Sequence, residues 1–139
     1  MVMVDTPPLN VQAAFAEDAL RNCDLVIPVL NYESYDQIPH FIRQYNVRFI
    51  VMNKVMRGAT KERYKIEKEI RRFIRETTLD ERDIIWISDR DVIRSSMNTG
   101  VPIRCRVPKP PRASRVFHLI AWRVEMDIRR REMAEVGEV

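Results

Sequence analysis

Cysteine and histidine are too few and too scattered to predict a disulfide framework or a metal site. The chain has two cysteines, Cys23 and Cys105, and two histidines, His40 and His118. None of them stands near another at the spacing of zinc ligands, and two distant thiols do not make a disulfide-rich domain. We therefore expect two reduced thiols, and histidines that serve at the surface or in packing.

Long apolar runs are also missing. No segment approaches the roughly 18 consecutive apolar residues that a membrane-spanning helix needs. The first residues, Met1 to Asp5, lack the basic region and the long apolar stretch of a signal peptide. With 45% hydrophobic and 32% charged residues, the composition is that of an ordinary soluble globular protein. These features predict a cytoplasmic protein with a packed core.

Glycine is scarce, and its positions exclude one kind of phosphate site. The three glycines are Gly58, Gly100 and Gly137, and none lies in a G-x-x-x-x-G-K-[ST] motif. In P-loop ATPases the backbone N–H groups of that loop hold the phosphates. The sequence therefore does not predict ATP hydrolysis by this chain alone, and we assign no catalytic residue.

Short apolar runs alternate with segments of helical periodicity. Strands are predicted at 2–4, 24–30, 47–52 and 83–87, and helices at 9–22, 34–45, 60–77, 89–97 and 114–134. This alternation is typical of βαβ units. It predicts an α/β fold with a mainly parallel four-stranded sheet, flanked by helices and followed by a C-terminal helix.

Two residues help to define the predicted helices, and prolines define a connector. Thr60 is available as the N-cap of the helix over 60–77. Pro39 must lie in the first turn of the helix over 34–45, because proline breaks a helix further along. Residues 102–111 hold four prolines without apolar periodicity, which predicts an extended connector.

Polar side chains gather where the predicted strands end. They are Asp5 and Thr6, Asn31, Asn53 and Lys54, and Ser88 and Asp89. In a parallel α/β sheet, ligands bind at the carboxyl ends of the strands. We therefore expect any ligand site to lie along this edge.

The first of these positions carries a family resemblance. The segment Val2-Met3-Val4-Asp5-Thr6-Pro7-Pro8 resembles the Walker B segment of ParA/MinD ATPases, although the same residues also suit an ordinary strand and turn. In that family the aspartate belongs to the coordination shell of Mg²⁺. The resemblance implies that Asp5 holds Mg²⁺ through water, a role that a carboxylate suits.

Two further segments follow in the family's order. Ile50-Val51-Met52-Asn53-Lys54-Val55 resembles the strand whose asparagine amide recognises adenine, with a donor and an acceptor side by side. The segment 88–102 is similar to the closing loop and short helix that border the base, but Ser88 stands where a proline is common. The cofactor-binding residues implied by the resemblance are Asp5, Thr6, Asn53, Ser88 and Asp89.

The resemblance covers residues 1–103 and implies the C-terminal part of a P-loop NTPase fold that begins mid-fold. ATP and Mg²⁺ would bind only if a missing segment or a partner supplied the phosphate loop. The absent strand would lie between residues 2–4 and 24–30, and this edge predicts a homodimer or a partner ATPase half. The implied function is ATPase-related, in plasmid or chromosome partitioning or positioning. The alternative is a non-catalytic DNA- or protein-binding module that retains the fold.

Basic residues suggest a second kind of partner. Lysine and arginine number 24 against 20 acidic residues, a net charge of +4. The connector over 104–112 and the start of the next segment carry cations without an acidic residue, and we predict DNA contacts there: Arg104, Arg106, Lys109, Arg112 and Arg115. ParA-type ATPases also use a basic surface for sequence-independent DNA binding.

Two helices have plainer interpretations. The helix over 60–77 interleaves basic and acidic residues, several of them four apart, which favours a solvated face. The segment 113–139 forms an amphipathic helix and tail, for which we favour covering the sheet over binding a membrane.

Overall fold

The computed structural model describes residues 1–6, 13–55, 60–88, 98, 100 and 114–137, with the side chains of Ala13 and Lys54 left out. The chain divides into two compact units, Met1–Ile85 and Trp86–Val139. The predicted helix over 89–97 and the predicted connector over 102–111 lie outside the described residues.

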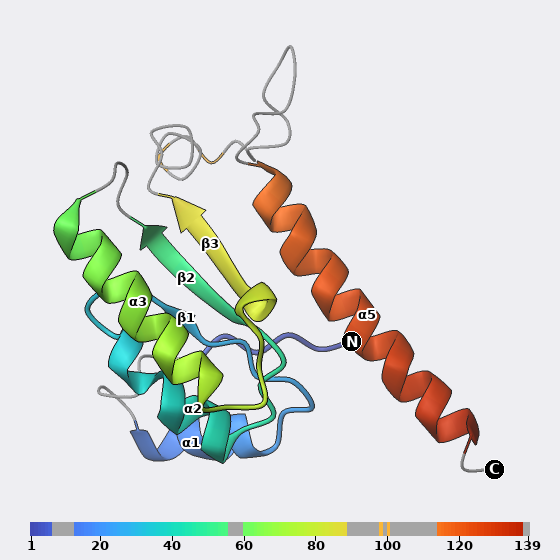
Figure 1. Cartoon of the computed structure of the whole chain (residues 1–139). Helices are drawn as coiled ribbons and strands as arrows, with labels where there is room; N and C mark the ends of the chain where they lie inside the picture. The colour runs from blue at the N-terminus through green and yellow to red at the C-terminus, as the bar shows by residue number, and fades with distance from the viewer. Residues whose placement is uncertain (7–12, 56–59, 89–97, 99, 101–113, 138–139) are drawn as a thin grey trace. The chain divides into compact units, whose positions relative to one another are not determined.

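Three strands form a parallel sheet in the order β1-β2-β3 (Figure 1). Their bounds are Val29–Leu30 for β1, Ile50–Val55 for β2 and Ile84–Ser88 for β3. In the pairing of β1 with β2, Val29 lies opposite Val51 and Leu30 opposite Met52. The α/β class and the parallel sheet are therefore confirmed.

The predicted first strand is wrong, so the four-stranded sheet becomes a three-stranded one. Residues 1–6 have no regular secondary structure, and Val2 and Met3 are 89% and 81% exposed. A strand forms only when its backbone N–H and C=O groups pair with a neighbouring chain. Within the described residues, the sheet begins instead at β1, where the side chain of Val29 is 61% exposed.

The apolar run over 24–30 does not form one continuous strand either. An isolated parallel bridge joins Val26 to Val47, and regular pairing resumes only at Val29. Pro28 explains the interruption, because proline has no N–H to donate. Its carbonyl still accepts the N–H of Val51 at 2.9 Å. At Pro28, the pairing with β2 therefore uses only the carbonyl group of the proline.

The strand predicted at 47–52 is displaced toward the C-terminus by three residues. The N–H of Val47 donates to the carbonyl of Tyr45 at 3.0 Å, so the chain is still turning at that point. β2 begins at Ile50, and its most deeply buried side chains include Ile50 and Met52. Asn53 and Lys54 consequently lie inside the strand and not beyond its end.

The helices of the first unit follow the predicted periodicity closely. They are α1 at Ala13–Arg21, α2 at Ile38–Gln44 and α3 at Lys61–Arg75, with short 3₁₀ turns η1 at Tyr35–Gln37 and η2 at Glu81–Asp83. Pro39 lies in the first turn of α2, as expected. The Thr60 hydroxyl accepts the N–H of Arg63 at 3.1 Å, which confirms the predicted N-cap of α3.

The core of the first unit lies between these helices and the sheet. α3 contributes Ile70 and Ile74, which are almost completely buried, and it packs against α2. Phe49 and Ile38 are equally inaccessible. Because the buried side chains of α3 lie on one side of the helix, its opposite side faces solvent.

The second unit contains the C-terminal helix, α5, at Arg115–Gly137. It begins within one residue of the predicted start and runs three residues further than predicted. Its last turns carry an ion pair four residues apart, with the Arg131 Nε 2.9 Å from an Asp127 carboxylate oxygen. Among the described residues, no helix combines the length and the apolar character needed to cross a bilayer.

Candidate functional site

The strand-end residues predicted to bind a nucleotide have different surroundings. Asp5 is exposed on the segment without secondary structure, with the half-buried Thr6 next to it. Asn53 is half-buried within β2, and Ser88 is the last residue of β3, the next strand in the sheet. Asp89 lies outside the described residues. Their roles in binding ATP stay predictions.

A metal site at Asp5 also stays a prediction. In the part of the chain that the structure describes, no group of three histidine, cysteine, aspartate or glutamate side chains is arranged to hold a metal ion. The predicted water-mediated contact of Asp5 with Mg²⁺ would need the nucleotide phosphates as further ligands, as is usual for Mg²⁺.

Asn31, at the carboxyl end of β1, organises a tight turn. Its side-chain oxygen accepts the N–H of Glu33 at 2.9 Å and the hydroxyl of Ser34 at 3.0 Å. Its own N–H donates to the Ser34 oxygen at 3.1 Å. The side chain is therefore committed to local structure. The turn fixes the segment that carries Tyr32 and Tyr35, whose hydroxyl groups reach α3.

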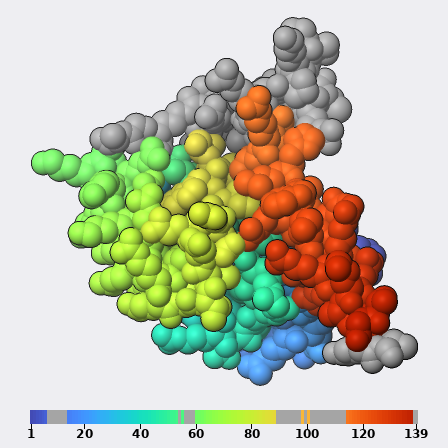
Figure 2. Space-filling view, turned by 45° about the vertical axis from the view of Figure 1, so that its right-hand side comes forward, coloured from blue at the N-terminus to red at the C-terminus, as the bar shows by residue number. Residues whose placement is uncertain are grey.

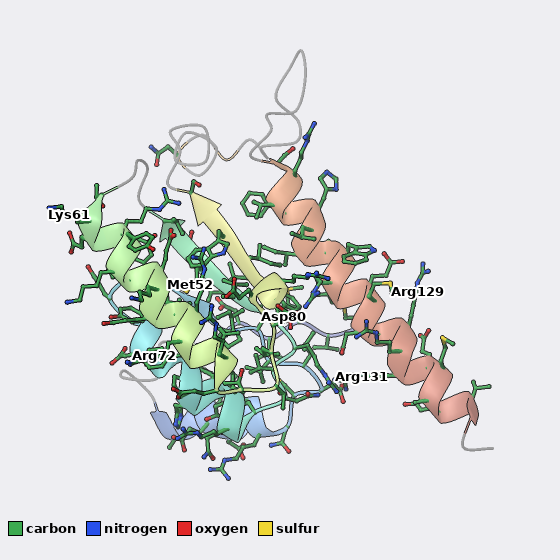
Figure 3. All side chains as sticks on the ribbon, viewed as in Figure 1. Met52, Lys61, Arg72, Asp80, Arg129 and Arg131 are labelled. Atoms are coloured by element: carbon green, nitrogen blue, oxygen red, sulfur yellow. The ribbon has the colours of Figure 1, made fainter. Side chains whose placement is uncertain are left out.

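The outer side of α3 carries a row of cations. Five exposed basic residues follow one another at intervals of four, three, four and three positions, and we call them the basic stripe: Lys61, Lys65, Lys68, Arg72 and Arg75. At 3.6 residues per turn they fall within an arc of about 80°, opposite Ile70, and span about 21 Å. Figure 3 labels Lys61 and Arg72 on this side, and α3 lies at the surface in Figure 2.

The acidic side chains of α3 lie beside the stripe. The carboxylate of Glu67 accepts the Nε–H of Arg63 at 2.6 Å and the hydroxyl of Tyr32 at 3.4 Å. The carboxylate of Glu69 accepts a short hydrogen bond from the hydroxyl of Tyr35. Both partners from the β1–α2 segment are neutral hydroxyl groups. The helix thus keeps its positive charges on one side and the charges of these two glutamates on its flanks.

Both tyrosines remain hydrogen-bond donors at neutral pH. Burial raises the pKa of Tyr32 above its ordinary value of 10.0, and the negative charge of Glu67 raises it further. The hydrogen bond to Glu69 raises the pKa of Tyr35, again with a contribution from burial. A raised pKa favours the protonated hydroxyl in the folded state. Both hydroxyl groups are therefore protonated, and able to donate, throughout the physiological pH range.

The C-terminal end of the stripe is partly neutralised. A carboxylate oxygen of Glu81 lies 3.3 Å from Arg75 and the other lies 3.7 Å from Arg71. The stripe's three lysines form no ion pair with a carboxylate among the described residues, and exposed lysines can reach an external anion at little cost. The cationic character of the stripe is therefore strongest from Lys61 to Arg72.

An aromatic contact holds Arg72 in place. Its guanidinium lies 5.4 Å from the centre of the Phe73 ring, a cation–π geometry. The Tyr35 ring packs on the same phenylalanine, with ring centres 6.2 Å apart. Arg72, Phe73, Tyr35 and Glu69 therefore form one connected cluster at the edge of the stripe.

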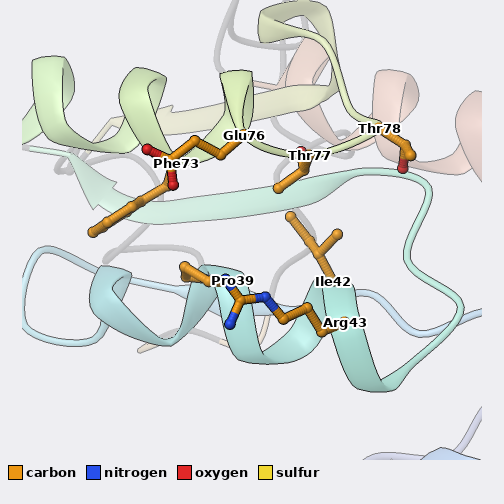
Figure 4. Close-up of a pocket in the computed structure, with 7 residues that line it drawn as sticks. All are labelled: Pro39, Ile42, Arg43, Phe73, Glu76, Thr77 and Thr78. Atoms are coloured by element: carbon orange, nitrogen blue, oxygen red, sulfur yellow. The ribbon is translucent and has the colours of Figure 1, made fainter.

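A small pocket lies between α2 and the C-terminal end of α3 (Figure 4). Its volume is about 250 Å³, and its lining residues are Pro39, Ile42, Arg43, Phe73, Glu76, Thr77 and Thr78. Ligand pockets usually measure about 300–1,000 Å³. The cavity is also far along α3 from the helix start that follows β2, so it is not the predicted strand-end site.

The predicted DNA-contacting residues are described only in part. Arg115 is the exposed first residue of α5, whereas Arg104, Arg106, Lys109 and Arg112 lie outside the described residues. Their contacts with DNA stay predictions. The basic stripe of α3 was not among the predicted sites, although the spacing of its residues is visible in the sequence.

No protein-family model, curated protein or solved structure matches this chain. Fold and surface together define a parallel α/β protein that presents a cationic helix face. The particular function must therefore be proposed from the residues themselves.

Proposed function

We propose that this chain is a non-catalytic module that binds double-stranded DNA independently of base sequence, through the basic stripe of α3. One observation carries the proposal. Five exposed cations share the outer face of the helix, while Glu67 and Glu69 are held beside it by contacts with other side chains. The predicted contacts of the connector and of Arg115 belong to the same proposal.

The dimensions of the stripe suit a DNA backbone. One strand of B-DNA carries a phosphate about every 3.4 Å along the helix axis, so about 21 Å of α3 runs beside about six phosphates. Four or five cations can each approach one phosphate oxygen. Lysine presents a compact point charge, which positions a protein on the backbone but does not read bases. The stripe therefore fits a sequence-independent contact.

Salt dependence provides the test. Each phosphate contact releases condensed counterions, and the slope of log K against log salt concentration is about −0.9 per contact. We expect a slope of about −3.6 to −4.5 for the four or five contacts of the stripe alone, equal for two duplexes of unrelated sequence, as measured by fluorescence anisotropy. A slope near zero, or no binding at low salt, would contradict the proposal. Stronger binding to anionic vesicles than to DNA would point to a membrane surface instead.

A second candidate is binding of an adenine nucleotide by a partial P-loop NTPase fold related to the ParA/MinD ATPases. It would serve partitioning or positioning, with the phosphate loop supplied by a missing segment or a partner. The observation that favours it is the position of Asn53 in the carboxyl-terminal half of β2, in a parallel sheet whose neighbouring strand ends at Ser88. That is the edge where ligands of such sheets bind.

Nucleotide binding predicts a thermal shift. A ligand that binds only the folded state raises the melting temperature, so ATP with Mg²⁺ at millimolar concentration should stabilise the wild-type chain. Asn53→Ala should melt at the same temperature with and without nucleotide, because it lacks the amide that would contact adenine. An unchanged wild-type melting temperature would remove this candidate for the isolated chain.

A further inference from the structure

We propose that Tyr35 is a positioning residue for the basic stripe: its hydroxyl holds the carboxylate of Glu69 away from Lys65 and Arg72 and so keeps both cations available to phosphates. The inference rests on the proposed DNA binding by α3. It adds a determinant of affinity that lies outside the helix and carries no charge.

The position of Glu69 on the helix makes such a restraint necessary. Glu69 follows Lys65 by four residues and precedes Arg72 by three, and both spacings bring side chains together on a helix surface. In the structure neither ion pair forms among the described residues. The carboxylate instead accepts the hydroxyl hydrogen of Tyr35, which is 34 positions away in the sequence.

Phe73 contacts both the tyrosine that binds Glu69 and the arginine next to it. The Tyr35 ring packs on Phe73, and this contact helps to orient the Tyr35 hydroxyl toward Glu69. The guanidinium of Arg72 lies over the same Phe73 ring. Phe73 therefore orients the donor that holds Glu69 and also the cation that Glu69 would otherwise neutralise.

Tyr32 offers a matched comparison within the same segment. It also donates its hydroxyl to a glutamate of α3, but that glutamate, Glu67, is held independently by Arg63 at 2.6 Å. Loss of the Tyr32 hydroxyl should therefore leave the Glu67 carboxylate where it is. Loss of the Tyr35 hydroxyl removes the one hydrogen bond that the structure gives to the Glu69 carboxylate among the described residues.

The test is a double-mutant cycle. Tyr35→Phe keeps the ring and removes the hydroxyl, so Glu69 can pair with Lys65 or Arg72. The strength of an ion pair at this spacing corresponds to about two-fold weaker DNA binding at low salt. The magnitude of the salt slope should also fall, by as much as about 0.9 for one lost contact. Tyr32→Phe should bind like the wild type.

Glu69→Gln separates positioning from a general structural effect. In a Glu69→Gln chain the carboxylate is already gone, so adding Tyr35→Phe should change the dissociation constant no further. Equal affinities of Tyr35→Phe and wild type would overturn the inference, and so would a two-fold loss that persists in the Glu69→Gln background. A wild-type chain that does not bind DNA at all would instead refute the proposed function, and this inference with it.

Discussion

Reversing two charges of the basic stripe, with Lys65→Glu and Lys68→Glu, is expected to abolish most DNA binding by this chain. For each phosphate contact, log K rises by about 0.9 when the salt concentration falls ten-fold. If the electrostatic contribution is taken as zero at 1 M salt, each contact raises the affinity at 0.1 M salt by a factor of about eight. Two lost contacts therefore weaken binding by about sixty-fold, and the new carboxylates add repulsion. Anisotropy titrations against one labelled duplex would measure this loss.

The control must separate the stripe from net charge. Arg21 and Arg43 lie in the last turns of α1 and α2, and both are exposed. The variant Arg21→Glu with Arg43→Glu changes the net charge by the same amount as the stripe variant but leaves α3 intact. It should keep nearly wild-type affinity. Equal losses in the two variants would mean that overall charge, and no particular helix face, governs binding.

All four substituted positions are exposed, and substitutions at such sites usually change the free energy of unfolding by about 0.5 kcal/mol or less. We therefore expect all variants to fold. Circular dichroism of each variant checks this directly. Lys61 and Arg72 provide a graded series, because each single neutralisation should reduce the salt slope by about one. A series in which only one position matters would indicate a specific pocket and not a stripe.

The local elements of this fold could be predicted where a single segment contains its own signals. α3 is the clearest case, because Ile66, Ile70 and Ile74 repeat every four residues and Thr60 supplies a cap. α2 was predicted with Pro39 in its first turn for the same kind of reason, since proline restricts the backbone locally. Helix formation depends mainly on such neighbours in sequence.

Strands proved harder, because a strand depends on a partner elsewhere in the chain. Residues 2–4 are as apolar as a strand requires, yet they have no regular structure. Pro28 interrupts the run that contains β1, and the position of β2 depends on a turn at Tyr45 to Val47. Apolar runs predicted the presence of β1, β2 and β3 but neither their lengths nor their pairing.

In the candidate site too, features set by neighbours in sequence could be predicted, and features that depend on distant segments could not. The spacing of the five cations of α3 could have been extracted from the sequence, because it follows helical periodicity. The glutamates between these cations indicated a solvated face, but their hydrogen-bond partners could not be predicted. Tyr32 and Tyr35 lie 35 and 34 positions from Glu67 and Glu69, so only the packing of the β1–α2 segment against α3 brings them together.

The second large effect concerns Ile70, whose side chain is fully buried beneath the stripe. Ile70→Ala is expected to destabilise the fold by about 2–5 kcal/mol, because it removes buried methyl groups and leaves a cavity. Ile70→Val should cost about 0.5–1.5 kcal/mol. Tyr64→Ala on the same helix is the control, since Tyr64 is 70% exposed and its truncation should change stability little. Urea unfolding followed by circular dichroism measures all three.

This stability series also tests the orientation on which the proposed DNA contact depends. The stripe faces outward because Ile70 and Ile74 face inward, about half a turn of the helix away. If Ile70→Ala and Tyr64→Ala were equally mild, α3 would not be packed through its isoleucines, and its cations would have no defined outer face. A large loss of stability in Ile70→Ala but not in Tyr64→Ala would show that α3 packs through its isoleucines. DNA binding by the folded Ile70→Val chain would then agree with a basic stripe on the opposite, outer face of the helix.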